Sequence, residues 1–237
     1  MAKKIVIGVV VLAVLVIGGA FFYAKVVEGN APKKLSLSDE PATTTKSSDS
    51  SGSSISSEAS ASVDGTWKAT VDSTVGYRVT EDFIGGLTNS EAVGRTHHVT
   101  GTLAIAGTTV TGSDFTADLT TVKSNRSQRD GQFQGRIMDT AQFPTATFRF
   151  SQPIDLGSVP AVGETITKSA TGRLTLHGTT RDVTFDVKAR RDGDRISVQG
   201  SIPVTFADYG IPNPSNPVVS TRDHGTLEFL LVFDKAS

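Results

Sequence analysis

The sequence predicts an all-β domain of about eight antiparallel strands, preceded by one membrane-spanning helix and a polar linker. Three observations support this prediction. An uncharged apolar run lies within the first 25 residues, a Ser/Thr-rich stretch follows it, and apolar and polar residues then alternate with a period of two. We therefore divide the chain into a transmembrane signal anchor (1–25), a disordered linker (26–62) and a folded β domain (63–237).

The run from Ile5 to Ala24 carries no charged residue. Roughly 20 helical residues at about 1.5 Å each span about 30 Å, which is the thickness of a bilayer core. Lys3 and Lys4 precede the run and resemble the start of an export signal. We expect a single-pass protein of the cell membrane whose C-terminal domain is extracytoplasmic. Cleavage after Ala24 or near Gly18 would instead release a soluble domain.

The linker is rich in Ser and Thr and has few bulky apolar residues, so it cannot bury enough surface to offset the entropy of ordering. We expect it to act as a flexible stalk with a reach of roughly 30–35 Å. Such a stalk would let the domain stay close to the membrane or move away from it.

The strands of the domain show one apolar face each. Leu103 and Ile105 alternate with threonine and alanine, and Val183, Phe185 and Val187 alternate with polar residues. Asp192-Gly193 is a strong hairpin signal between two such segments. Period-two segments joined by short turns predict an antiparallel barrel or a sandwich, and periodicity alone does not choose between them.

One connection, Ser124 to Thr140, is too long and polar for a hairpin, and a short helix could form there. Arg129 and Asp130 lie within it. They could form a salt bridge that orders the loop, or a polar lip at the mouth of a barrel. Glu81 and Asp82 are the clearest acidic pair elsewhere, and we expect that pair to be exposed in a loop.

Composition excludes several kinds of site. The chain has no cysteine, and 23 basic residues nearly balance 24 acidic ones. Thiolate catalysis and disulfides are therefore excluded, and nothing indicates a nucleic-acid partner. Adjacent histidines such as His97 and His98 point to opposite faces of a strand, so they do not form one metal site there. We expect no metal, no cofactor and no catalytic residues.

Several segments resemble the YceI-like family of exported bacterial proteins, which are associated with binding polyisoprenoid lipids. The resemblance covers about Trp67 to Phe233. The matching pieces, in order, are Asp72–Val79, Arg129-Asp130 with Phe133, Phe143–Phe148, Gly172–Phe185, Phe206–Ile211 and a terminal strand through Glu228. The family's usual histidines around its opening strand are absent, because no histidine lies directly before Ser73 or after Val79.

The resemblance implies a lipocalin-like, eight-stranded antiparallel β-barrel with an apolar interior. The expected partner is an isoprenoid or other long-chain lipid. Arg129 and Asp130 are candidates for the barrel mouth. The candidate lining residues are the inward apolar set Leu103, Ile105, Phe115, Leu119, Phe148, Phe150, Leu174, Leu176, Val183, Phe185, Val198, Phe229 and Leu231.

The sequence is compatible with three functions. The first is a membrane-anchored, non-catalytic binding protein for a long apolar lipid. The second is a ligand-free interaction module of the cell envelope, which would have a filled core. The third is an envelope hydrolase, which would need a cluster of polar groups in one cleft. The sequence does not indicate the oligomeric state.

Overall fold

The computed structural model describes residues 31–39, 62–83, 88–216 and 219–236. The expected transmembrane run Ile5–Ala24 lies outside these ranges. Within them, no helix has both the length and the apolar character needed to cross a bilayer. The predicted anchor therefore remains a prediction.

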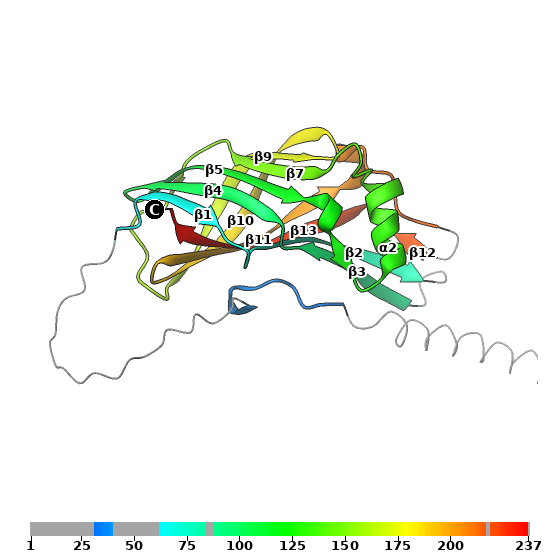
Figure 1. Ribbon diagram of the computed structural model, residues 1–237, viewed down its shortest axis with the longest axis horizontal. Helices are drawn as coiled ribbons and strands as arrows, with labels where there is room; N and C mark the ends of the chain where they lie inside the picture. Colours follow the sequence, from blue (N-terminus) through cyan, green and yellow to red (C-terminus); the bar gives the residue numbers. More distant parts are fainter. Residues whose placement is uncertain (1–30, 40–61, 84–87, 217–218, 237) are drawn as a thin grey trace, which may run out of the picture.

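The described residues form a closed antiparallel barrel (Figure 1). Eight strands make the ring in the order β1, β4, β5, β7, β9, β10, β11 and β13, and pairing of β1 with β13 closes it. The predicted all-β barrel is confirmed, and the sandwich alternative is wrong. The strands are β1 Gly65–Ala69, β2 Thr74–Phe83, β3 Thr88–Thr96, β4 Val99–Ala106, β5 Thr109–Asp118, β6 Lys123–Ser124, β7 Thr145–Phe150, β8 Ile154–Asp155, β9 Thr165–Leu176, β10 Thr179–Asp192, β11 Arg195–Thr205, β12 Val219–Thr221 and β13 His224–Lys235.

Strands β2 and β3 extend the wall beyond β1 and β4. The first half of β13 pairs with β2, and its last residues pair with β1, so β1 and β2 follow each other along one edge of β13. His97 and His98 lie in the break between β3 and β4, so the prediction that they sit on one strand is wrong. The His97 ring instead lies 3.0 Å from Thr74 Oγ1, so it links the start of β2 to the residues between β3 and β4.

The connection between β6 and β7 forms the expected helix. It consists of α2 (Ser127–Gln132) and a π-helical turn, η4 (Phe133–Ile137). Figure 1 shows α2 at one end of the barrel beside β2 and β3. Phe133 and Met138 are buried in the main core, so this connection closes the end of the barrel with apolar side chains. Shorter 3-10 turns, η3 (Leu119–Thr121) and η5 (Phe206–Tyr209), lie at strand ends.

Local sequence signals explain the neighbouring turns. The predicted hairpin at Asp192-Gly193 joins β10 to β11, and Gly193 has a positive φ of 63°. Such a φ favours glycine because a Cβ atom would be strained there. Pro144 directly precedes β7, where its missing N–H interrupts no ladder, and its carbonyl accepts a hydrogen bond from the Leu119 amide.

Residues 31–39 pack against the outside of the barrel, and we call them the docked segment. The segment ends in η2 (Leu37–Asp39) and runs along the outer side of β13 and its neighbours (Figure 1). Leu35 and Leu37 are buried with Leu230 and Val232 of β13. The expectation of disorder throughout 26–62 is therefore wrong for this part, because these two leucines supply apolar surface that the Ser/Thr-rich stretch lacks.

Arginine side chains of the barrel hold the backbone of the docked segment. Arg78 Nη2 donates to the Pro32 carbonyl over 2.8 Å, and Arg95 Nη2 donates to the Lys33 carbonyl. Farther along, Arg190 Nη2 donates to the Leu37 carbonyl over 3.3 Å. The segment thus crosses the outer face from β3 and β2 to β10. Residues 40–61 connect it to β1 of the same barrel.

Candidate functional site

The interior of the barrel contains two cavities. The first has a volume of about 150 Å³ and is bordered almost entirely by apolar atoms. One water needs roughly 10–15 Å³ on the same measure, so there is room for about ten water-sized groups. Inward-facing residues of β4, β5, β7, β9, β10, β11 and β13 form its wall. The period of two seen in the sequence directs these side chains inward.

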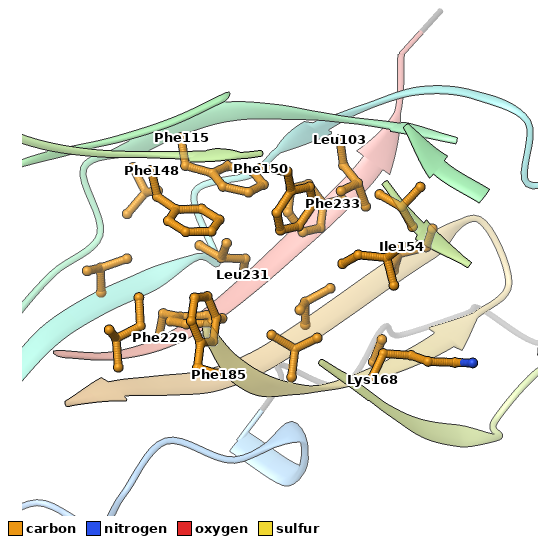
Figure 2. Close-up of a pocket in the computed structure, with 18 of the residues that line it drawn as sticks. Leu103, Phe115, Phe148, Phe150, Ile154, Lys168, Phe185, Phe229, Leu231 and Phe233 are labelled. Carbon is orange, nitrogen blue, oxygen red and sulfur yellow. The ribbon is translucent and has the colours of Figure 1, made fainter. Parts of the chain in front are cut away.

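Aromatic rings form much of this wall (Figure 2). The Phe185 ring contacts Phe148 and Phe229, with centroid distances of 5.4 and 5.9 Å, and both pairs meet edge to face. Phe148 and Phe229 lie directly over Gly172 and Gly200, where a Cβ atom would come within 2.5 and 2.6 Å of the rings. Glycine at these inward positions therefore lets the rings lie flat along the wall and leaves the centre open.

The second cavity lies toward the end that α2 and η4 cover, and its volume is about 130 Å³. Val75, Ala146 and Leu227 line both cavities, so these three residues mark the boundary between them. The two cavities therefore lie one after the other inside the barrel. An extended apolar molecule longer than one cavity would have to pass this boundary.

The two charged residues of the second cavity, Arg129 and Glu81, are paired with each other. Arg129 Nη2 donates to Glu81 Oε2 over 3.1 Å, and Arg129 Nη1 donates to Asn125 Oδ1 over 2.7 Å. Glu81 and Asp82 both lie in β2 and are partly buried, so the expectation of an exposed acidic loop pair is wrong. Tyr77 stacks on Phe133 with centroids 4.9 Å apart, and burial raises the pKa of its hydroxyl above the usual value.

Asp130 has a different role from Arg129. It is buried, and its Oδ1 accepts hydrogen bonds from Ser124 N and Ser124 Oγ at 2.8 and 2.7 Å. Asp130 thus fixes the start of the connection to its helix. Of the two predicted barrel-mouth residues, the structure places Arg129 on the second cavity and Asp130 within the loop. Any role for either in ligand contact stays a prediction.

The structure places most of the predicted lining residues around the two cavities. Val183 is the exception, because it packs against the core without lining either cavity. Contact of these residues with a ligand remains a prediction. Around the first cavity lie Leu103, Ile105, Phe115, Phe148, Phe150, Leu174, Phe185, Val198, Phe229 and Leu231, and around the second lie Leu119 and Leu176.

Sequence reasoning missed several residues of the site. Phe133 and Met138 come from the connection, where no strand period could direct attention to them. Lys168 was also missed, although it follows Ile166 and precedes Ala170 on the inward face of β9. The period of two would have placed it inside, but the predicted lining contained apolar residues only. In the described ranges, no group of three or more His, Asp or Glu residues could hold a metal ion.

Comparison with known proteins identifies relatives over most of the chain. The model of the YceI-like domain matches residues 49–233. The UPF0312 protein VPA0850 of Vibrio parahaemolyticus is 31% identical over 102 residues, which are 40% of this chain and 50% of the relative. The UPF0312 protein PA0423 of Pseudomonas aeruginosa is 30% identical over 109 residues, 43% of this chain and 53% of the relative. The chain therefore spans about half the length of these curated relatives.

Two solved structures share the fold. A polyisoprenoid binding domain from Saccharophagus degradans, implicated in plant cell wall breakdown, superposes with a TM-score of 0.58 at 21% identity, covering 72% of this chain and 98% of that one. BcnA of Burkholderia cenocepacia superposes with a TM-score of 0.52 at 20% identity, covering 69% and 98%. At these identities the likeness shows a shared fold, and it does not by itself identify a ligand of this chain.

Proposed function

Since the chain belongs to the YceI family, we propose that its barrel binds an isoprenoid or a similarly long apolar lipid without transforming it. The observation that carries the proposal is the pair of apolar cavities in line inside the barrel. The Saccharophagus degradans domain with the same fold, described as polyisoprenoid binding, supports the same ligand class.

A barrel with an apolar interior can shield a lipid chain from water. Each CH₂ group that leaves water for an apolar environment gains about 0.8 kcal/mol. A chain of many carbons therefore leaves a membrane only slowly unless another apolar container receives it. The first cavity presents aliphatic and aromatic carbon almost throughout, so it can replace the membrane as solvent for part of that chain.

Open interior space favours lipid binding over the ligand-free interaction module, which would have a filled core. Packed interiors leave few voids larger than one water molecule. A cavity of about 150 Å³ beside another of about 130 Å³ is well above that size. Lipid binding also needs no cluster of catalytic groups.

We further propose that the protein is a single-pass protein of the cell membrane, with the barrel on the extracytoplasmic side. The uncharged run Ile5–Ala24 supports this placement. The docked segment begins at residue 31, so only seven peptide units separate it from Ala24. At about 3.5 Å each they reach roughly 25 Å at most. The barrel would then stay close to the membrane that supplies its ligand, and the Ser/Thr-rich stretch would not set that distance.

Lipid analysis of the full-length protein tests the binding proposal. The protein is purified from its own host membranes in a mild detergent, and native mass spectrometry records any bound molecule. A long-chain lipid should copurify and be recovered unchanged after incubation. A barrel that is empty and also takes up no long-chain isoprenoid from added vesicles would refute the proposal. Carbonate washing of membranes tests the anchor separately, because an integral protein stays in the pellet.

A further inference from the structure

The two ends of the interior differ in charge. Of the described residues around the first cavity, Lys168, Arg190 and Arg191 are cationic and none is acidic. Around the second cavity, Arg129 is balanced by Glu81, which it contacts at 3.1 Å. The first cavity thus has cationic residues at its border, of which Arg190 is paired with Asp192, whereas the second cavity has a neutral ion pair.

Lys168 is the residue on which this asymmetry depends. It is half-buried on the inward face of β9, between Ile166 and Ala170, and pairs with Val187 of β10. Within the described part of the chain its ammonium group makes no hydrogen bond or ion pair. In Figure 2 its ammonium group points away from Phe148 and the other labelled rings. A lysine that is half-buried as a residue keeps its ammonium group at water or beside an anion, because an unpaired buried charge is costly.

The two arginines differ from Lys168 because both already bond to protein groups. Arg190 Nε donates to Asp192 Oδ2 over 2.6 Å, so the Asp192 carboxylate on β10 already has a cationic partner. Arg191 is buried next to the last residue of β10, and its Nε donates to the Gly193 carbonyl over 2.9 Å. Glu164 accepts a hydrogen bond from the Ala161 amide and is exposed. Of the three cationic residues at this cavity, Lys168 is therefore the one whose charged group is available for a new contact.

We propose that this end of the barrel receives an anionic head group, and that Lys168 forms its ion pair. The inference rests on the proposed lipid-binding function and adds the head-group charge and the direction of the ligand. The apolar chain extends from Lys168 past the aromatic rings toward Ala146 and the second cavity. The head-group chemistry is an anionic oxygen, as in a phosphate monoester or a carboxylate.

Three probes with the same fifteen-carbon chain test the proposal: farnesyl phosphate, farnesoic acid and farnesol. Equilibrium dialysis of radiolabelled probes against the purified full-length chain gives each Kd below the micelle concentration. A hydrogen bond to a charged group is stronger than one between neutral groups, so at least one anionic probe should bind about tenfold more tightly than farnesol. The probe that gains identifies phosphate or carboxylate as the preferred head group.

Variants separate the role of Lys168 from general effects. Lys168→Met should remove the preference for the anion, so that the anionic probes bind no more tightly than farnesol to the same variant, whereas Lys168→Arg should keep the preference. Lys188→Met is the matched control, because Lys188 is exposed on the outer face of the adjacent strand β10. If all three probes bind equally, or if Lys168→Met keeps the preference, the head-group inference is wrong and lipid binding stands. If none of the probes binds and no lipid copurifies, the proposed function itself fails.

Discussion

Arg78 and Glu228 form a nearly buried ion pair on the outer face of the barrel. Arg78 Nε lies 3.3 Å from Glu228 Oε2, and the two side chains are 7% and 6% exposed. Arg95 Nη2 contacts the other carboxylate oxygen at 2.8 Å. Outward-facing charges of a barrel normally meet water, but these lie beneath the docked segment. Two carbonyl groups of that segment accept hydrogen bonds from Arg78 and Arg95. The ion pair and the docked segment therefore form one structural unit.

Replacing Glu228 with glutamine should destabilise the protein strongly. The change removes the buried carboxylate and leaves Arg78 with the more exposed Glu91, at 2.7 Å, as its carboxylate partner. Breaking a buried pair costs about 3–5 kcal/mol, and the remaining partner places the expected loss at the low end. We expect a loss of about 3 kcal/mol in the free energy of unfolding, measured by urea denaturation. Asp114→Asn is the control, because Asp114 forms an exposed pair with Arg149 and should lose less than about 0.5 kcal/mol. Equal effects of the two variants would contradict a structural role for the buried pair.

Truncating Leu37 to alanine should loosen the docked segment. Leu37 is 8% exposed and packs with Leu230 and Val232. Removing its side chain should cost about 2 kcal/mol, at the low end for buried leucines because the site lies at the surface. Limited proteolysis should then cut the chain near residues 31–39 sooner. Lys34→Ala, at an exposed position of the same segment, should change neither measurement.

Enlarging Ala146 should divide the interior. Ala146 is buried and lines both cavities, so Ala146→Leu places a larger side chain at their boundary. Binding of a long prenol should weaken about tenfold, because the lost passage forces part of its chain into water. A probe short enough for one cavity should bind as before. Thr145→Leu, at an exposed neighbouring position, is the control. Undiminished binding of the long prenol would contradict an extended path through both cavities.

Ionisation of Tyr77 should weaken the fold at alkaline pH. Burial raises the pKa of Tyr77 in the folded state above its ordinary value of 10.0. Below that pH both states keep the proton; above it the unfolded state releases the proton and the folded state retains it. Stability is therefore present below about pH 10 and falls as the pH rises further. In Tyr77→Phe the free energy of unfolding should fall less steeply between about pH 10 and 11. Parallel curves for the two proteins would show that burial does not shift this pKa.

The sequence by itself determined the strands and the direction of their side chains, because a period of two fixes which residues share a face. It also located the Asp192-Gly193 hairpin and the one long connection, since turn chemistry is local. Most of the predicted interior residues consequently lie around the cavities. The His97-His98 break was missed, because it depends on where β3 and β4 end against their neighbours.

Only the tertiary structure decided closure of the barrel, which requires the pairing of β1 with β13 across most of the domain. It also decided the open interior, because Gly172 and Gly200 acquire their effect only when rings from adjacent strands lie over them. Burial of Leu230 and Val232 on the outer face depends on the docked segment, which is far from β13 in sequence. Alternation describes one strand at a time, whereas burial on both faces arises from contacts between distant parts of the chain.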